Sequence, residues 1–302
     1  MKKEKVYKKP AFWFFSIPPV GWYGVFMLMP LIMLWAFSFG STNEQFQVVL
    51  TWTTKNYLTA FQPIYLKILL KTILFSALAT AICLVIGFFV ALYISFSSPQ
   101  WKPFWLILVI LPFWTNLLIR VFGVSTMLSN SGMINKLLEF FWNKIKILEE
   151  VLGWQILSGD YFEPYDMLYN YGAVVAGMVY VSLPFMILPI YSSLDKLDIS
   201  YLEASLDLGA SHTRTIFKIM IPMIMPGIGF GIFLTFIPSL STFLIPDMLG
   251  GPNAQMIANV IQRQFGAGSN WPLGAALSFI LMYITFAFFF GHMLYGARRD
   301  KR

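Results

Sequence analysis

Charged residues are scarce in this sequence. Of its 302 residues, 21 are Lys or Arg and 14 are Asp or Glu, which makes 12% of the chain, whereas a typical soluble domain contains about 25%. Hydrophobic residues account for 58% and aromatic residues for 18%. So little polar material cannot cover a water-exposed surface. The composition therefore excludes an ordinary soluble protein and indicates a protein whose surface faces mainly lipid.

Several chemical signatures are also missing. A single cysteine, Cys83, excludes an intramolecular disulfide framework and a cysteine-based metal cluster. The sequence contains no Gly-x-x-x-x-Gly-Lys-Ser/Thr phosphate loop, no His-Glu-x-x-His motif and no Gly-x-Ser-x-Gly nucleophile elbow. With two histidines alone, His212 and His292, a histidine-rich metal site is not expected. We therefore expect a non-catalytic chain that binds no cofactor or metal of its own.

Long apolar runs are what the sequence does contain. A helix needs about 20 mostly apolar residues to cross the hydrocarbon core of a bilayer. The sequence has six such runs, and the first continues past Met33 without a small-x-small cleavage site, so we expect it to remain as a membrane helix. The predicted spans cover residues 19–39, 71–96, 103–127, 171–194, 223–245 and 273–295.

The distribution of basic residues predicts the orientation. Lysines and arginines cluster in residues 1–18, at 298–302 and in the loops expected on the same side, whereas the segment 129–170 carries more acidic than basic residues. By the positive-inside rule, both termini are expected in the cytoplasm. The net charge of +7 thus indicates a cytoplasmic membrane face and not nucleic-acid binding. We predict a basic tail (1–18), a six-helix membrane domain (19–297) with a cytoplasmic loop at 195–222, and a basic C-terminus (298–302).

The long external loop contains one expected helix. Apolar residues recur at helical spacing over residues 134–152, which predicts an amphipathic helix. Two interpretations stand side by side: the helix covers the bundle, or it lies on the membrane surface or against a partner.

The polar segment between the fourth and fifth spans predicts two short helices around a turn. Ser200 and Glu203 have the spacing of a capping box, in which a hydroxyl and a carboxylate cap the first turn reciprocally. Gly209 can adopt the left-handed conformation that ends the first helix, and Ser211 or Thr213 can start the second. A compact helical pair joined directly to two membrane helices can move both of them when a partner grips it.

These residues resemble the cytoplasmic signature of permease subunits of type I ABC importers, which reads Glu-Ala-Ala, three residues, Gly, nine residues, Ile-x-Leu-Pro. Glu203-Ala204-Ser205 matches the triplet, Gly209 follows after three residues, and Ile219-Met220-Ile221-Pro222 follows after nine more. Ser for Ala and Ile for Leu are conservative departures. The resemblance implies an all-α integral membrane fold with six transmembrane helices (MetI-like).

In that family the signature forms a coupling helix that docks into a cytoplasmic ATPase. The resemblance therefore assigns the coupling role to a small set of residues near the turn. They are Glu203, Ala204, Ser205 and Gly209, with Asp207 and Arg214 flanking them.

Further stretches resemble the first permease subunit of spermidine/putrescine importers. They are 112–120, 183–186, 191–193, 247–251, 259–261 and 271–272. The resemblance implies half of a polyamine pathway in a bacterial cytoplasmic membrane. It also implies a second permease subunit, an external substrate-binding protein and a dimer of cytoplasmic ATPases that bind ATP and magnesium.

A polyamine needs oxygen ligands for its ammonium groups and aromatic faces along its methylene groups. Each candidate also has a plain role: Asp247 caps a helix or faces headgroup water, Trp114 anchors the interface, Phe185 packs, and Asn116 joins helices through a hydrogen bond. The pathway candidates are Trp114, Asn116, Tyr180, Phe185, Phe243 and Asp247.

Two further residues carry expectations. Arg120 is predicted near the outer interface, about 27 Å along the helix from Lys102, where its charge can reach headgroup water. It is interpreted as structural, paired with Asp247 when substrate is absent. Pro238 is predicted to kink the fifth span, and we hypothesise that the kink transmits ATPase motion to the gate.

Two alternatives are weighed against a polyamine ABC permease. One is an ABC permease for another solute. The other is an ion-driven secondary transporter, which usually shows inverted repeats or broken helices with buried charges. Neither feature is expected from this sequence.

Overall fold

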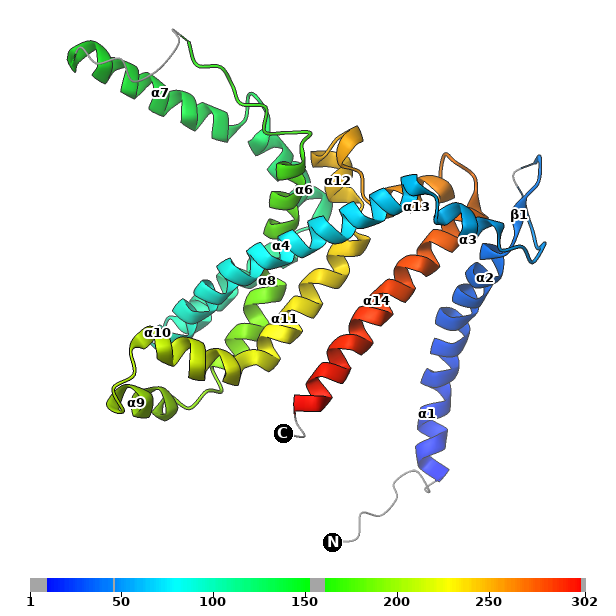
Figure 1. Ribbon diagram of the computed structural model, residues 1–302, viewed down its shortest axis with the longest axis horizontal. Helices are drawn as coiled ribbons and strands as arrows, with labels where there is room; N and C mark the ends of the chain where they lie inside the picture. The colour runs from blue at the N-terminus through cyan, green and yellow to red at the C-terminus, as the bar shows by residue number, and fades with distance from the viewer. Residues whose placement is uncertain (1–9, 46, 153–160, 300–302) are drawn as a thin grey trace. The chain divides into compact units, whose positions relative to one another are not determined.

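The computed structural model describes residues 10–45, 47–152 and 161–299 (Figure 1), and the described residues are mostly helical. The elements in chain order are α1 (Pro10–Tyr23), η2 (Gly24–Leu28), α2 (Met29–Ser38), β1 (Ser41–Thr42), β2 (Val48–Val49), α3 (Lys55–Ala60), α4 (Pro63–Phe96), α5 (Lys102–Ile110), η3 (Leu111–Trp114), α6 (Leu117–Leu128), α7 (Met133–Leu152), α8 (Tyr171–Leu194), α9 (Ser200–Asp207), α10 (His212–Thr215), η4 (Ile216–Met220), α11 (Ile221–Ser241), α12 (Leu244–Leu249), η5 (Pro252–Ala254), α13 (Ile257–Phe265) and α14 (Trp271–Arg299).

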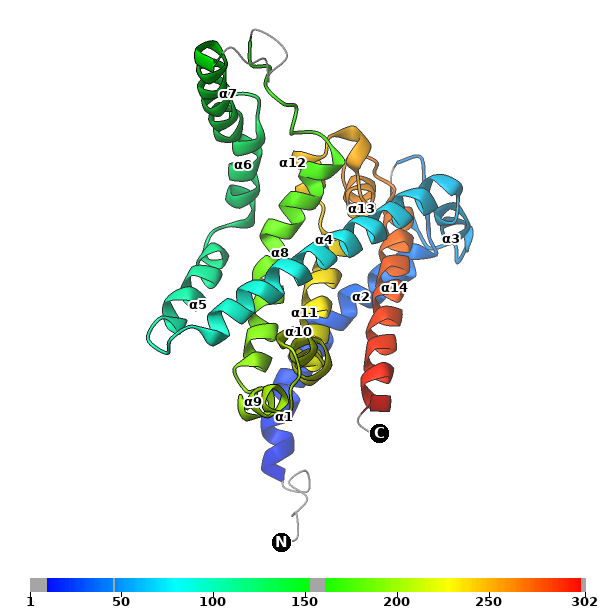
Figure 2. The same ribbon diagram turned by 60° about the vertical axis from the view of Figure 1, so that its left-hand side comes forward.

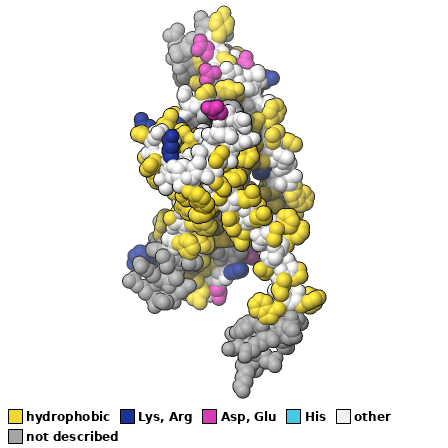
Figure 3. All heavy atoms as spheres, turned by 90° about the vertical axis from the view of Figure 1, so that its right-hand side faces the viewer, with side chains coloured by type: hydrophobic (Ala, Val, Ile, Leu, Met, Phe, Trp, Pro, Cys, Tyr) yellow, Lys and Arg dark blue, Asp and Glu magenta, His cyan; other side chains and the backbone are white. Residues whose placement is uncertain are grey.

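Six helical segments of the described residues are long and apolar enough to cross a membrane, and hydrophobic side chains dominate the face shown in Figure 3. The first, second, fourth and sixth predicted spans are confirmed as helices. The first of these helices begins at Pro10, so residues 10–18 of the predicted tail are helical, and residues 1–9 and 300–302 lie outside the described part. The six segments are Trp13–Ser38, Pro63–Phe96, Leu117–Ile147, Tyr171–Leu194, His212–Ser241 and Trp271–Gly291.

The third predicted span is not one helix. Helix α5 passes into the short 3-10 helix η3, Thr115 is extended, and α6 starts afresh at Leu117 (Figure 2). Pro112 cannot donate a backbone hydrogen bond, and the Asn116 side chain accepts one from the backbone N–H of Leu118 at 2.8 Å, which caps the new helix. The prediction of a continuous helix over 103–127 is therefore wrong.

The fifth predicted span is also interrupted. Helix α11 ends at Ser241, Thr242 is extended, and the separate helix α12 follows. Pro246 has no N–H to donate to the carbonyl of Thr242, so a helix through this point would lose a hydrogen bond and meet the proline ring. The buried Asn259 holds the break, because its Nδ2 donates to the Phe243 carbonyl at 2.8 Å and its Oδ1 accepts from the Met256 N–H at 3.1 Å.

The chain forms two compact units, residues 1–66 with 260–284 and residues 67–259 with 285–302. In the first unit, a short antiparallel hairpin of β1 and β2 follows α2. Asn56 ties α3 to the end of α2 by donating to the carbonyls of Ser38 at 2.9 Å and Gly40 at 2.8 Å. The Ser38 hydroxyl also lies 2.9 Å from the Tyr57 hydroxyl.

In the second unit, the most extensive packing joins α8 and α11. Small residues allow it: a Cβ added at Gly227 would lie 2.6 Å from the Pro189 carbonyl oxygen, and one at Gly231 would lie 2.8 Å from the Met186 sulfur. Buried residues of α4, α8 and α11 form a hydrophobic cluster with Met186 and Ile190 fully buried. The close packing of α8 against α11 therefore depends on these two glycines.

Helix α7 confirms the helix predicted within the external loop. Asn135 fixes its start, because its side chain donates to the Tyr165 carbonyl at 3.1 Å and accepts from the Tyr165 N–H at 3.0 Å. Its apolar residues Leu137 and Phe141 are 52% and 60% exposed in the chain by itself. Leu137 and Phe141 are therefore not buried against the rest of the chain, which disfavours the interpretation of this helix as a cover over the bundle.

Candidate functional site

The polar segment 195–222 folds as the predicted helical pair, α9 and α10, at the end of α8 and the start of α11 (Figure 1). Gly209 has φ +82° and ends α9. The N–H of Gly209 bonds to the Leu206 carbonyl at 2.8 Å, and the N–H of Ala210 bonds to the Ser205 carbonyl at 3.1 Å. This pair of bonds is the Schellman motif, which requires a left-handed residue at this position. The predicted left-handed conformation of Gly209 at the end of the first short helix is thus confirmed.

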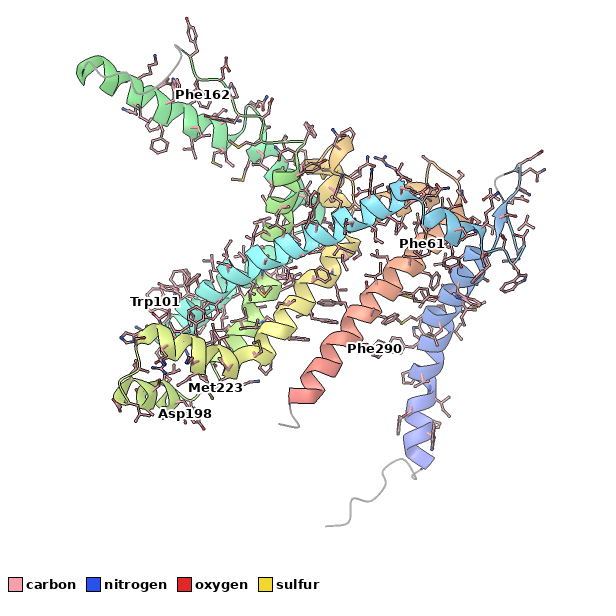
Figure 4. All side chains as sticks on the ribbon, in the orientation of Figure 1. Phe61, Trp101, Phe162, Asp198, Met223 and Phe290 are labelled. Atoms are coloured by element: carbon pink, nitrogen blue, oxygen red, sulfur yellow. The ribbon has the colours of Figure 1, made fainter. Side chains whose placement is uncertain are left out.

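The predicted capping box is wrong. The carboxylate of Asp198, which lies just before α9 (Figure 4), accepts from the N–H of Ser200 at 3.0 Å, whereas the Ser200 side chain makes no cap bond. Hydrogen bonds from the side chain and backbone of Ser200 lower the pKa of Asp198. In a capping box the Ser200 N–H would bond to the Glu203 carboxylate, but here the Asp198 carboxylate, two residues before Ser200, takes this N–H at the positive helix end. For α10, the Ser211 hydroxyl caps the N–H of Arg214 at 3.3 Å.

Ser205 joins the two helices. Its hydroxyl lies 3.0 Å from the hydroxyl of Thr215, and both side chains are buried, 6% and 5% exposed. A buried hydroxyl needs a partner, so the Ser that replaces Ala in the family signature is matched by a threonine ten residues later. The Ser for Ala departure was interpreted as conservative, and Thr215 was not identified as the hydrogen-bond partner of Ser205.

The other predicted coupling residues face outward. Glu203, Ala204, Asp207, Gly209 and Arg214 are exposed. Leu208, at the turn, is 89% exposed.

A groove of about 520 Å³ lies between this pair and the end of α4. Its walls are mainly apolar and include Leu202, Leu206 and Phe96, with Glu203 and His212 at its polar positions. Apolar residues of α9 and of the end of α4 thus line the same groove, and Glu203 contributes to its lining.

Helix α10 continues without a break into α11. The π-helical segment η4 connects them, and Pro222, which has no N–H to donate, follows directly after it at the start of α11. The residues predicted to couple to an ATPase are therefore joined to α11 by continuous helical backbone.

An ion pair braces the same end of the second unit. The Lys102 Nζ, at the start of α5, lies 2.9 Å from the Asp195 carboxylate at the end of α8. The hydrogen bond from Lys102 lowers the pKa of Asp195, and the Tyr191 hydroxyl donates to the same oxygen at 3.2 Å. Nothing in the sequence pairs residues 93 positions apart, so this ion pair was not predicted.

The two helix breaks meet at a cavity of about 390 Å³. Irregular backbone is stable at membrane depth where it is buried in protein or lines a water-filled space. The cavity is mostly apolar, with four hydroxyl-bearing residues and one arginine. Its lining residues are Phe113, Leu117, Arg120, Met178, Val181, Ser182, Phe185, Pro238, Ser239, Ser241, Thr242, Phe243, Leu244 and Ile245.

The structure brings two of the six predicted pathway residues to this cavity. Phe185 packs edge-on against Phe113 with ring centroids 4.7 Å apart, and Phe243 belongs to the break after α11. Sequence analysis missed Phe113 and the hydroxyls of Ser182 and Ser239, because their convergence depends on how the broken helices pack.

The other four candidates lie elsewhere. Trp114 is 88% exposed. The Asn116 side chain caps its own helix, α6, and does not form the interhelical hydrogen bond considered as its plain role. Tyr180, 45% exposed, lines a separate depression formed by α4 and α8. Asp247 is exposed in the first turn of α12.

Arg120 differs from its prediction. It forms no ion pair with Asp247 in the described part of the chain, and its Nε and Nη1 are buried without a hydrogen-bond partner. Its guanidinium carbon lies 5.9 Å from the centre of the Phe113 ring. The sequence was expected to contain neither broken helices nor buried charges. Both occur here, in the breaks at η3 and after α11 and in Arg120, so this expectation is wrong.

Sequence and structure comparisons identify similar proteins. No family model matches the chain. The spermidine/putrescine transport system permease protein PotB of Escherichia coli is 37% identical over 265 residues, which cover 88% of this chain and 90% of that protein. PotB of Haemophilus influenzae is 38% identical over 261 residues, 85% of this chain and 84% of that protein.

A solved structure shares the fold. A bacterial alginate ABC transporter in complex with an alginate pentasaccharide-bound periplasmic protein superposes with a TM-score of 0.71 at 16% sequence identity. The match covers 96% of both chains. Helices broken around a cavity do not by themselves indicate a secondary transporter, since the relatives at 37% and 38% identity, and not the fold match, decide the family.

Proposed function

This chain belongs to the permease subunits of spermidine/putrescine ABC importers, and from that premise we propose that it forms half of a polyamine pathway across a bacterial cytoplasmic membrane. It is a non-catalytic transport subunit. ATP and magnesium bind to a separate cytoplasmic ATPase dimer. A second permease subunit completes the pathway, and an external binding protein delivers the substrate.

One observation carries the proposal. The helical pair that presents Glu203 and Leu208 is continuous, through η4 and α11, with the cavity wall at Pro238 and Ser241. Force applied to α9 and α10 by an ATPase therefore reaches the cavity through an unbroken helix. The Ser205 to Thr215 hydrogen bond keeps the two short helices together under that load.

The cavity suits the methylene part of a polyamine. Phe113, Phe185 and Phe243 supply aromatic faces, and hydroxyls of Ser182 and Ser241 supply oxygen atoms for an ammonium group. No carboxylate lines it among the described residues. Acidic ligands for the outer ammonium groups therefore come from other surfaces of the path, among which Asp247 stays a candidate, as do Trp114, Asn116 and Tyr180.

The decisive experiment measures ATP hydrolysis by the assembled transporter in proteoliposomes with its binding protein. We expect putrescine or spermidine to stimulate hydrolysis and to enter the vesicles. If a different solute stimulates hydrolysis and neither amine does, the polyamine assignment is wrong and the chain is an ABC permease for that solute.

A variant tests the coupling segment in the same assay. Glu203→Lys reverses a charge on the surface proposed for the ATPase, so we expect loss of substrate-stimulated hydrolysis and of ATPase binding. Glu139→Lys, the same reversal on the exposed surface of α7, is the matched control. Normal uptake and ATPase binding with Glu203→Lys would count against the coupling assignment.

A further inference from the structure

Arg120 is a charged residue without a neutralising partner inside the second unit. Two of its guanidinium nitrogens, Nε and Nη1, are buried and make no hydrogen bond in the described part of the chain. The group lies over the face of Phe113, which compensates a cation only in part. A buried charge usually has a paired carboxylate, so this arrangement needs an explanation.

The residues around Arg120 do not neutralise its positive charge. The cavity that it lines contains no Asp or Glu among the described residues, and its polar members carry neutral hydroxyls. Aromatic and aliphatic walls screen a charge weakly, so its potential extends across the cavity.

The position of Arg120 also argues against a role in anchoring to headgroups. The α8 part of the cavity wall runs from Met178 to Phe185. At about 1.5 Å per residue, these residues lie roughly 10 to 21 Å from Tyr171 along a helix about 36 Å long. The guanidinium therefore faces the middle of a membrane helix and not its outer end, which corrects the predicted depth.

We propose that Arg120 is a fixed cationic barrier that keeps cations from crossing the closed pathway. This inference rests on the proposed function, because the cavity must belong to the path. Two unit charges about 6 Å apart at an effective dielectric constant of about 20 repel enough to lower the local cation population about 100-fold. An arginine that excludes cations from a pore is an established physical device in channels.

The same geometry provides a way to relieve the barrier. The wall facing Arg120 consists of Pro238 to Ile245, the end of α11 and the break that follows it. Because α11 continues from the coupling segment, motion of α9 and α10 shifts this wall relative to Arg120. The barrier then falls only when the ATPase moves the helix.

The test measures passive leak, independently of substrate. Proteoliposomes holding the assembled transporter are loaded with potassium, and efflux is followed without ATP or binding protein. We expect Arg120→Gln to raise efflux at least tenfold and Arg120→Lys, which keeps the charge, to stay within twofold of the unmodified protein. Lys67→Gln removes an equal charge from an exposed position on α4 and is the matched control.

A second variant keeps the test decisive if Arg120→Gln does not assemble. Ser241→Asp places a carboxylate in the cavity while Arg120 remains, and the neutralised field should raise efflux by a similar factor. Unchanged efflux in the assembled variants would overturn the proposal, as would an Arg120→Lys protein that leaks like Arg120→Gln. Efflux would also be unchanged if an acidic residue of the second permease subunit pairs with Arg120, because the charge would then be neutralised already and the proposal would be wrong. If amines fail to stimulate hydrolysis, the polyamine assignment fails while the potassium result still stands.

Discussion

At the scale of single residues, the signature positions act through hydrogen bonds and backbone geometry. Gly209 is required because it adopts φ +82°, and Asn259 is required because it satisfies the Phe243 carbonyl at the α11 break and the Met256 N–H just before α13. Ser205 gains a role through Thr215 that the family pattern does not contain. Residues that marked the family in the sequence are thus largely those that hold irregular backbone in place.

A double-mutant cycle tests the Ser205 to Thr215 bond. Ser205→Ala alone leaves the Thr215 hydroxyl buried without this partner, which should cost about 1 to 3 kcal/mol of unfolding free energy. The double variant Ser205→Ala with Thr215→Val should recover much of that loss, because no polar group stays unsatisfied. The measurement is thermal unfolding of the assembled transporter in detergent. Additive losses in the double variant would contradict the proposed bond.

The Lys102 and Asp195 ion pair predicts a pH dependence. Because its pKa is lowered in the folded state, Asp195 contributes stability above its unfolded pKa of about 3.9, and this contribution is lost as pH falls through the folded pKa. Asp195→Asn should therefore melt lower than the unmodified protein at pH 7, and the difference should vanish once the pH lies below the folded pKa of Asp195. The pair is partly exposed, at 26% and 44%, so the effect should be small, within about 1 kcal/mol. A difference that persists at low pH would assign the effect to packing.

At the scale of elements, interrupted helices decide where the site forms. The α5 to α6 and α11 to α12 breaks both border the cavity, and each contains a proline with a polar residue that satisfies or caps the freed backbone. Sequence periodicity finds apolar runs but does not detect such breaks, since the residues on both sides remain apolar. The hydrophobic runs were therefore predicted well and the cavity was not.

Pro238 allows an element-scale prediction. It lies inside α11 and lines the cavity, so Pro238→Ala should restore a backbone N–H and straighten the last turns. We expect uptake to fall several-fold while ATPase binding is retained. Pro226→Ala, in the same helix at an exposed position away from the cavity, is the control. Normal substrate-stimulated hydrolysis and uptake with Pro238→Ala would refute the hypothesis that this kink carries motion to the gate.

At the scale of the whole molecule, six apolar segments and the placement of basic residues predict the topology. Both termini and the coupling segment should face the cytoplasm, and 129–170 should face outward. Chain connectivity alone does not establish the side of the membrane, so this orientation is a prediction to be measured.

Single cysteines test the orientation. In a Cys83→Ser background, which removes a buried thiol, a membrane-impermeant reagent should label Lys144→Cys in intact cells. The same reagent should label Arg214→Cys only after permeabilisation. Both positions are exposed in the chain, so accessibility reports the side of the membrane. The opposite labelling pattern would invert the topology and remove the coupling segment from the ATPase.

The sequence by itself determined the membrane class, four of the spans as helices, the paired helices of the coupling segment and the family. These follow from local hydrophobicity, turn chemistry and residue spacing, which need no knowledge of distant contacts. Tertiary structure alone decided that Asp198 caps α9, that Ser205 meets Thr215, and that Arg120 faces a cavity without a carboxylate. Each of these depends on which free polar group or helix break lies nearest in space, and spacing along the chain does not specify it.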